Sequence, residues 1–231
     1  MMDKHEGQSK TLMEILMNNR NTDYGRRYGF EEIKTVGQFR GRLPVAHYGD
    51  YAPLITLMRE LGESNIFTSD DTLCYILSFG CGGEARVIPY TQRYMELFGA
   101  ASAADTPYLY FSPEALIGVG VADSPEEYTL LPYAGFFEFA PIRGGVMDEA
   151  GALLPEELEA GGEYGVIVTN CLGFYRYKTD DVVRVSRIEK GVPVISVCRR
   201  GEATTDFSGI GENRRFLGTA GKDTPATTAR Y

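Results

Sequence analysis

The chain has 231 residues, 43% of them hydrophobic, and a formal net charge of −9. This composition is typical of a folded protein with a real core, and the length allows one large or two small domains. An acidic surface argues against a general nucleic-acid binder, which needs a basic face to neutralise phosphates. It does not argue against ATP, which backbone N–H groups and a metal can hold locally.

The cysteines and the N-terminal stretch indicate the compartment. The four cysteines are scattered and form no CxxC pair, which argues against a zinc site or a redox motif. Unpaired cysteines fit a reducing environment. The first residues lack the apolar segment of a signal peptide, and no apolar run approaches the ~20 residues of a membrane span. We therefore expect a cytoplasmic protein with neither a membrane nor a nucleic acid as partner.

The first third of the chain is expected to be helical. Thr11 and Glu14 have capping-box spacing, which Thr35 repeats with the glutamine three residues later. Pro53 suits the first turn of a third helix, and Gly62 suits its C-terminal stop. Between them the apolar residues recur at i, i+3, i+4 and i+7, so one stripe should pack against another surface. These residues are Leu54, Leu57, Met58 and Leu61.

From about residue 72 the pattern changes to short β-rich runs separated by turns. The expected fold class is α/β, with a helical N-terminal segment followed by mixed β-sheets, because helices come first and crossover helices are few later. The expected strands are Leu73–Leu77, Ala85–Tyr90, Tyr108–Phe111, Tyr128–Leu131, Gly165–Thr169, Val182–Val185 and Val192–Val197. Gly118-Val-Gly120 and Gly209-Ile-Gly211 are interpreted as turns, and 148–162 as a solvated connection.

The most informative segment is a glycine-rich stretch between two of these runs. Residues 78–86 have the sequence SFGCGGEAR. Glycines let backbone amides wrap an anion, because no Cβ blocks the approach, and Arg86 after the loop can neutralise a phosphate. The segment lacks the GK[ST] ending of a Walker loop. From these residues alone, a structural hairpin with a flexible turn explains the pattern equally well.

Three segments, taken in order, resemble the nucleotide-binding motifs of adenylate-forming enzymes. They are LSFGCGGEARVIPYT (77–91) for the phosphate loop, YFSPE (110–114) for the second motif, and FYRYKTDDVV (174–183) for the third, usually YRYRxGDVV. The YRY form resembles the auxin-responsive (Gretchen Hagen type) acyl acid–amido synthetase family in its bacterial form, a branch of the adenylate-forming (ANL) superfamily. Further family-like segments are 22–30, 136–141 and 164–170, and the similarity covers most of residues 8–215.

The resemblance implies an ATP-dependent acid–amino acid ligase that uses Mg²⁺. In such an enzyme a carboxylic acid attacks the α-phosphate of ATP, and the amine of an amino acid then attacks the acyl adenylate to form an amide. Transfer at phosphorus depends above all on charge neutralisation and positioning. No motif identifies which acyl acid or which amino acid the chain uses.

The same resemblance assigns residues by motif position. Ser112 would add a hydroxyl at the phosphates, Glu114 would hold Mg²⁺ as an oxygen ligand, and Asp181 would bind the ribose hydroxyls. The loop residues that would line the phosphates are Ser78, Gly80, Gly82 and Gly83. The basic residues implied in catalysis are Arg86 and, near the ribose and phosphates, Arg199 or Arg200, between which spacing does not choose.

The chain also departs from the family pattern. Phe79, Cys81 and Gly82 stand where the phosphate loop usually carries hydroxyl donors. Arg86 stands where lysine is common, which keeps the charge and changes the geometry. Asp180 replaces a glycine of the third motif, an exchange expected to strain that turn.

Length is the larger departure. Only sixteen residues separate Thr91 from Tyr108, where the family implies most of a subdomain, and the chain ends soon after Phe216, where the family continues into a small lid domain. The resemblance thus implies an internal deletion and a C-terminal truncation. Strands without neighbours would favour self-association. The alternative to an active ligase is a non-catalytic nucleotide-binding relic or an inactive fragment. The expected divisions are 1–197, a partial ATP-binding adenylating domain; 198–217, a hinge remnant; and 218–231, a disordered tail.

Overall fold

The computed structural model describes residues 4–79, 85–103, 108–121 and 124–200. The helices are α1 (Lys4–Asn18), α2 (Asp23–Tyr28), α3 (Val36–Arg42), α4 (Tyr48–Leu61) and α5 (Gln92–Ser102), with 3-10 turns η1 (Phe30–Glu32) and η2 (Pro155–Glu157). The strands are β1 (Thr72–Phe79), β2 (Ala85–Thr91), β3 (Leu109–Ser112), β4 (Ala115–Val121), β5 (Ser124–Leu130), β6 (Gly135–Arg143), β7 (Val146–Met147), β8 (Glu163–Asn170), β9 (Tyr177–Glu189) and β10 (Val192–Arg200).

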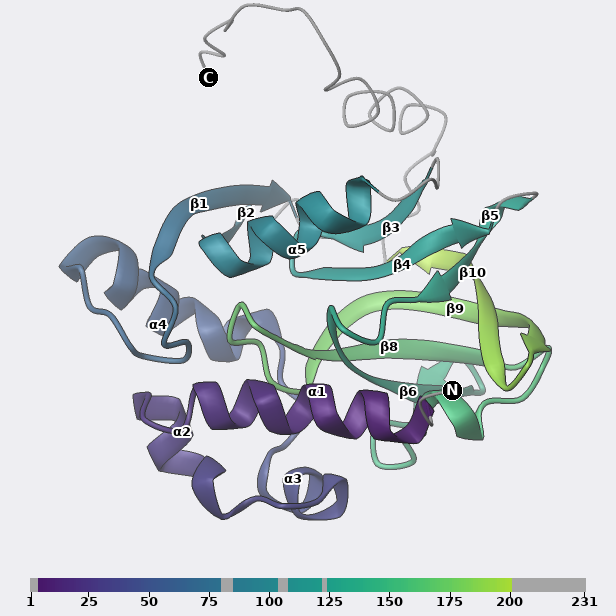
Figure 1. Ribbon diagram of the computed structural model, residues 1–231, viewed down its shortest axis with the longest axis horizontal. Coiled ribbons are helices and arrows are strands. Elements are labelled where there is room, and N and C mark those ends of the chain that lie inside the picture. The colour runs from purple at the N-terminus through teal and green to yellow at the C-terminus, as the bar shows by residue number, and fades with distance from the viewer. Residues whose placement is uncertain (1–3, 80–84, 104–107, 122–123, 201–231) are drawn as a thin grey trace, which may run out of the picture.

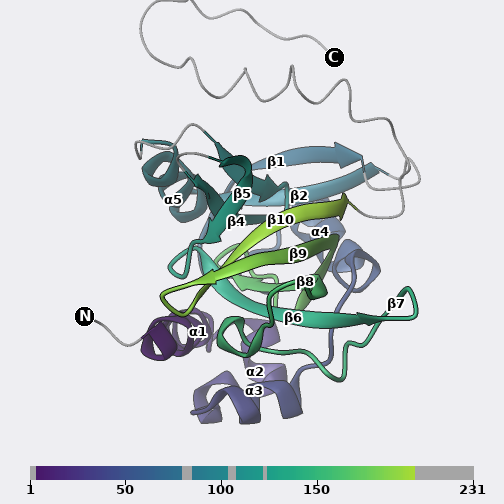
Figure 2. The ribbon, with the colours of Figure 1, turned by 90° about the vertical axis from the view of Figure 1, so that its right-hand side faces the viewer.

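The strands form two sheets. An eight-stranded sheet has the order β3-β4-β5-β10-β9-β8-β6-β7, and β1 pairs with β2 in a separate hairpin. Neighbouring strands in both sheets run antiparallel. Helices α1, α2 and α3 lie on one side of β6 and β8, whereas β1, β2 and α5 lie on the other side near β3 (Figures 1 and 2). The expected α/β class, with helices followed by sheets, is confirmed.

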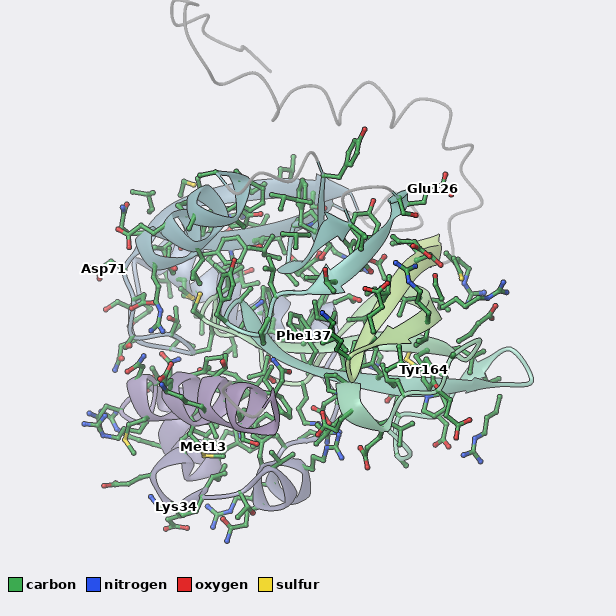
Figure 3. All side chains as sticks on the ribbon, turned by 45° about the vertical axis from the view of Figure 1, so that its right-hand side comes forward. Met13, Lys34, Asp71, Glu126, Phe137 and Tyr164 are labelled. Atoms are coloured by element: carbon green, nitrogen blue, oxygen red, sulfur yellow. The ribbon has the colours of Figure 1, made fainter. Side chains whose placement is uncertain are left out.

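Helix α1 packs across β6 and β8, and polar side chains fix it there. Gln8 donates from Nε2 to the Gly135 carbonyl at 2.9 Å and accepts from the Phe137 N–H at 2.8 Å. Phe137 is fully buried in the interior of the molecule (Figure 3). The prediction that Thr11 caps a helix is wrong, because α1 begins upstream and the Thr11 hydroxyl donates to the Pro132 carbonyl at 2.8 Å. Thr11 anchors the helix to the sheet.

The ends of α3 and α4 are set by local hydrogen bonds. Thr35 caps α3 as predicted, since its hydroxyl accepts the N–H three residues on. Helix α4 begins upstream of Pro53, contrary to the prediction, because the Asp50 carboxylate accepts the His47 N–H at 2.8 Å and closes the first turn there. Gly62, with φ +69°, ends α4 as predicted.

The buried face of α4 differs from the predicted stripe. Its buried residues are Tyr51, Ile55 and Met58. Met58 and the half-buried Leu54 of the predicted stripe face the core, whereas Leu61 is 68% exposed and Leu57 is 39% exposed. Tyr51, in the first turns of α4, is buried instead, and the predicted start at Pro53 left this residue out of the helix.

Each of the seven predicted β-rich runs overlaps a strand, but the interpretation of Gly118 and Gly120 as a turn is wrong. Both lie within β4. A Cβ on Gly118 would lie 2.7 Å from the Thr129 carbonyl oxygen, and one on Gly120 would lie 3.1 Å from the Tyr108 Cβ. Glycine is required here for the close approach of neighbouring chain segments. The pair at 209–211 lies outside the described residues.

The segment 148–162 is also more ordered than a solvated connection. Ala152 and Leu158 are buried, and Leu153 forms a bridge with Phe139 of β6. Residues 198–200 continue β10, while the rest of the expected hinge and the tail lie outside the described residues. Among the described helices, none has the length and apolarity that crossing a membrane would require.

Candidate functional site

The β1–β2 hairpin brings the ends of the glycine-rich loop together. Ser78 lies opposite Arg86 in the hairpin register, whereas Gly80, Gly82 and Gly83 lie outside the described residues. The Tyr48 hydroxyl accepts the N–H of the residue after Arg86 at 2.7 Å, and the Arg86 guanidinium carbon lies 5.5 Å from the Tyr48 ring centroid. Helix α4 therefore fixes the strand on which Arg86 is carried.

Arg86 reaches residues from both other motifs. Its Nη1 lies 3.5 Å from Glu114 Oε1 and donates to the Tyr177 hydroxyl at 3.5 Å. Its Nη2 donates to Asp180 Oδ2 at 3.3 Å. We call Arg86, Glu114, Tyr177 and Asp180 the Arg86 cluster. Three segments that are far apart in sequence thus converge on one guanidinium.

Glu114 sits in the tight turn between β3 and β4, and two contacts hold this turn. Asn170 Nδ2 donates to the Glu114 carbonyl at 2.7 Å, and the Tyr90 hydroxyl donates to the Pro113 carbonyl at 2.9 Å. The Glu114 side chain is only 6% exposed, and the Tyr177 hydroxyl donates to its Oε1 at 3.3 Å. The fold therefore presents one oriented carboxylate oxygen at the Arg86 cluster.

Asp181 follows the cluster on β9 and is buried. Its Oδ2 accepts the Tyr110 hydroxyl of β3 at 2.8 Å. Arg200 lies opposite Asp181 in the β9–β10 register, and Arg199 lies opposite the next residue of β9. The Arg199 side chain is exposed. The backbone thus brings both arginine positions to the strand that carries Asp181.

Ser112 ends β3 two residues before Glu114. Its Oγ is buried and has no hydrogen-bond partner among the described residues. Buried hydroxyls are nearly always paired in native proteins, so an orphaned one beside a charged cluster is expected to meet a ligand or water.

Two domain matches identify the chain at this point. Residues 1–116 match the GH3 family N-terminal domain, and residues 128–200 match the GH3 family central domain. The chain belongs to the GH3 family. The family resemblance found in the three motifs is therefore confirmed, and the bacterial form stays a prediction.

Known GH3 proteins are similar to this chain over part of their length. Jasmonoyl–L-amino acid synthetase JAR4 of Nicotiana attenuata is 38% identical over 111 residues, covering 42% of this chain and 18% of that protein. The probable indole-3-acetic acid-amido synthetase GH3.4 of Oryza sativa subsp. japonica is 32% identical over 137 residues, covering 54% of this chain and 21% of that protein. The chain thus spans about a fifth of the relatives it matches.

A solved structure confirms the fold of this GH3 chain. The AtGH3.15 acyl acid amido synthetase in complex with 2,4-DB superposes with a TM-score of 0.73 at 14% sequence identity. The superposition covers 85% of this chain and 68% of that one. At this identity the likeness is one of fold.

The charges in the Arg86 cluster determine which protons stay in place. Burial raises the pKa of Tyr177, and the adjacent Glu114 raises it further, so the hydroxyl remains a donor. Burial lowers the pKa of Arg86, but Tyr177, Asp180 and Glu114 outweigh it and leave the pKa above its ordinary value. The cluster therefore holds one cation between two carboxyl groups.

The described residues of this GH3 chain include no group of three or more His, Cys, Asp or Glu that could hold a metal ion. Glu114 is a single oriented carboxylate. Mg²⁺ is commonly held by one or two carboxylates together with substrate phosphates, so this donor fits a metal that arrives with a nucleotide.

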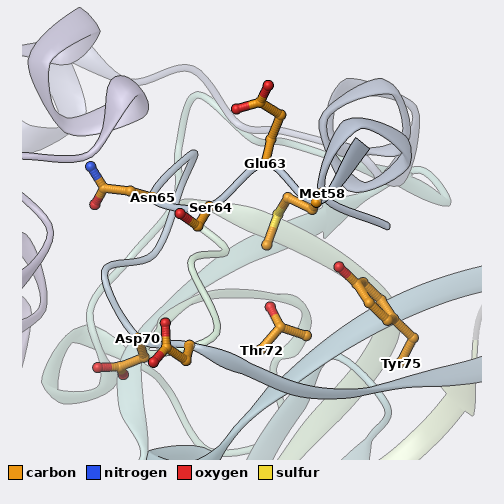
Figure 4. Close-up of a pocket in the computed structure, with 9 residues that line it drawn as sticks. Met58, Glu63, Ser64, Asn65, Asp70, Thr72 and Tyr75 are labelled. Carbon is orange, nitrogen blue, oxygen red and sulfur yellow. The ribbon is translucent and has the colours of Figure 1, made fainter. Parts of the chain in front are cut away.

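A separate surface depression of about 350 Å³ lies between the end of α4 and the start of β1 (Figure 4). It is lined by Met58, Gly62, Glu63, Ser64, Asn65, Asp70, Asp71, Thr72 and Tyr75. None of these residues belongs to the Arg86 cluster, so this depression is not the candidate nucleotide site.

Several residues that build the site carry no role predicted from the sequence. Tyr110 and Tyr177 stand inside the second and third motifs, and their positions there were the available signal. Asp180 was noted only as a replacement for glycine. Tyr48 has no local signal, because its contact with β2 depends on the packing of α4.

Proposed function

We propose that this chain forms the nucleotide-binding part of an ATP-dependent acid–amino acid ligase of the acyl-adenylate-forming type. The observation that carries the proposal is the convergence of Arg86 and Glu114, from two motifs, on the residues just before Asp181 of the third. A nucleotide triphosphate needs a cation, a carboxylate for its metal and an acceptor for its ribose within one small region. The substrates would be a small carboxylic acid and an amino acid.

Each side chain has a defined part in this proposal. Arg86 would neutralise the phosphates, and Ser112 would donate its orphaned hydroxyl to them. Glu114 would hold Mg²⁺, which neutralises phosphate charge when bound. Asp181, oriented by Tyr110, would accept hydrogen bonds from the ribose. The loop residues Ser78, Gly80, Gly82 and Gly83 would surround the phosphates, with Arg199 or Arg200 approaching from β10.

The test is Mg-ATP binding by calorimetry, followed by pyrophosphate exchange with a panel of carboxylic acids. Glu114→Gln and Asp181→Asn should each weaken binding by about tenfold or more, because a charge-assisted contact contributes roughly 1.5–3 kcal/mol. Glu63→Gln, in the separate depression, is the matched control and should bind normally. No binding to the wild-type chain at millimolar Mg-ATP would refute the proposal.

The same experiment decides between catalysis and binding alone. Exchange that the Glu114→Gln variant abolishes would establish adenylate formation. Binding without exchange would favour the alternative, a non-catalytic nucleotide-binding chain. On the ligase proposal we place the protein in the cytoplasm, where ATP is abundant and where the unpaired cysteines described in the structure would stay reduced.

We further propose that the chain self-associates through β1. Leu73 and Leu77 of this strand are each 59% exposed, and Ile76 is 38% exposed. The strand carries no charged residue and pairs only with β2 within the described part of the chain. An uncharged apolar edge favours pairing with another strand. Leu77→Lys should lower the associated fraction in sedimentation, whereas Leu61→Lys on α4 should not. Equal behaviour of the two variants would contradict an interface at β1.

A further inference from the structure

Asp180 adopts an unusual backbone conformation. Its φ is +64°, in the left-handed region, at the position where the third motif usually has glycine. The β8–β9 pairing is irregular here, since Gly165 pairs with Val182 and Ile167 pairs with Lys178, so four steps of β9 face two of β8. Aspartate tolerates this conformation better than most side chains, but glycine adopts it without cost. We therefore looked to the contacts of the Asp180 carboxylate for an explanation of this residue.

The Asp180 carboxylate is directed at Arg86. Its Oδ2 accepts from Arg86 Nη2 at 3.3 Å, while Glu114 Oε1 lies 3.5 Å from Nη1. The two acidic residues differ in exposure, because the Asp180 side chain is 33% exposed and that of Glu114 is 6% exposed. Asp180 therefore occupies the solvent-facing side of the guanidinium. An incoming anionic ligand would reach Arg86 from this side.

We propose that Asp180 is a built-in competitor for the polyphosphate of a nucleoside triphosphate at Arg86. The inference rests on the proposed nucleotide site. A carboxylate and a phosphate use the same planar donors of an arginine. In the structure Asp180 pairs with Arg86, and binding of the polyphosphate would exchange that partner. The glycine usual at this position would leave the guanidinium open, so the aspartate lowers the affinity of the site.

The long, single contact between the two side chains fits an exchangeable pair. The Nη2–Oδ2 distance of 3.3 Å is longer than the roughly 2.7–2.9 Å of a strong charge-assisted hydrogen bond. The Asp180 side chain is also partly exposed to water. When its carboxylate leaves Arg86, water can solvate it, so no unpaired charge is left buried. A ligand can displace it without disturbing the buried Glu114.

The test measures Mg-ATP affinity of the full chain by calorimetry for wild type, Asp180→Asn and Asp180→Gly. Asparagine keeps the size and the tolerance of a positive φ but removes the charge. We expect both variants to bind Mg-ATP about threefold to tenfold more tightly than wild type, with Asp71→Asn, an exposed aspartate at the separate depression, binding as wild type. A ligand-independent readout is thermal unfolding of Asp180→Asn, Arg86→Lys and the double variant, in which the two residues should show coupling.

The outcomes separate this inference from the proposed function. Tighter binding of both variants supports the competitor role. Equal or weaker binding of Asp180→Asn, with clear binding by wild type, overturns the competitor role and leaves the nucleotide site intact. A gain seen in Asp180→Gly alone assigns the effect to the backbone and also overturns it. Absence of Mg-ATP binding in every variant overturns both proposals, whatever the unfolding experiment finds.

Discussion

Two arginine–glutamate pairs flank the same motif segment and differ in kind. Arg176 and Glu138 form a buried bidentate pair, with Nε–Oε2 at 3.0 Å and Nη2–Oε1 at 3.1 Å. Arg176 Nη1 also donates to the Leu43 carbonyl at 2.8 Å, and Arg40 Nε donates to Glu138 at 2.8 Å. The second pair, Arg86 and Glu114, contacts the next residue of the motif, Tyr177. Its two side chains meet only between Nη1 and Oε1, at 3.5 Å.

The difference separates a structural pair from an exchangeable one. Both side chains of the Arg176–Glu138 pair are buried, and each forms several short hydrogen bonds. The pair therefore ties α3 and the loop after it to β6 and to the start of β9. The Arg86 cluster has long single contacts and a partly exposed acid. Residues 174–181 thus include contacts to the core, at Tyr175 and Arg176, and contacts to the site, at Tyr177 and Asp180. An arginine–glutamate pair thus stabilises the fold at Arg176, whereas at Arg86 the same residue types can exchange a partner for a ligand.

The largest predicted effect tests stability directly. Arg176→Met should destabilise the fold by about 3–5 kcal/mol, because it leaves the buried Glu138 carboxylate with only Arg40 as its cation. Arg86→Met, which keeps a similar stem, should cost less, about 1–3 kcal/mol, because its contacts are long and single although Glu114 is buried. Urea unfolding of both variants measures the contrast. Equal losses would erase the distinction between the two pairs.

The next largest predicted effect is a loss of folding stability at alkaline pH, which depends on buried tyrosines of the core. Burial raises the pKa of Tyr51 and of Tyr175 well above the ordinary value of 10.0. Below that value both phenols are protonated in the folded and the unfolded chain, and their full contribution to stability is present. As the pH rises above it only the unfolded chain releases these protons, so stability is lost. Between about pH 8 and about pH 10.5 these two phenols should contribute about 2 kcal/mol of the loss.

Denaturant unfolding across this pH range measures that loss, and Tyr51→Phe should reduce the loss by about 1 kcal/mol. Arg86 keeps its charge over the range, because its pKa lies above the ordinary value. The fold should therefore weaken before the site loses its cation. A stability that is flat above pH 9, or an unchanged loss in Tyr51→Phe, would contradict the assignment to these phenols.

The sequence predicted the strands and the motif residues because their signals are local. Runs of β-branched and aromatic residues give the strands, and the order of the three motifs correctly brings Glu114 close to the third motif. The start of α4 was missed because a histidine and Asp50 form its cap, a combination without a standard pattern. Gly118 was wrongly predicted to lie in a turn. The glycine is required by the close Thr129 carbonyl, which lies on another strand and gives no local signal.

The electrostatic partners could not be predicted for the same reason. Asp180 and Arg86 are 94 residues apart, and their contact depends on the hairpin and β9 meeting in space. Arg176 and Tyr177 are adjacent in sequence, yet one binds Glu138 and the other Glu114. Arg176 has a φ of +48° and lies just before β9, so the period-two alternation of an extended strand does not describe this pair. Sequence spacing alone therefore does not predict which carboxylate each side chain meets.

The smallest predicted effect is the most selective. Tyr177→Phe removes the hydroxyl that orients Glu114 Oε1, and a single hydrogen bond contributes roughly 0.5–1.5 kcal/mol. Mg-ATP affinity should fall about threefold to tenfold, with a stability loss of about 0.5–1.5 kcal/mol, because Tyr177 is fully buried and Glu114 Oε1 keeps its contact with Arg86. Calorimetry and urea unfolding of one sample give both values.

The matched control is Tyr175→Phe, two residues away on the structural side. Its hydroxyl donates to the Phe67 carbonyl at 2.7 Å in the buried core, so its loss should cost about 1–3 kcal/mol of stability and leave Mg-ATP affinity unchanged. The two variants delete the same atom from positions two residues apart, and only the Tyr177 variant should lower Mg-ATP affinity. If both lower affinity alike, residues 174–181 do not include separate structural and ligand-facing residues, and the contrast between the two arginine–glutamate pairs loses its physical basis.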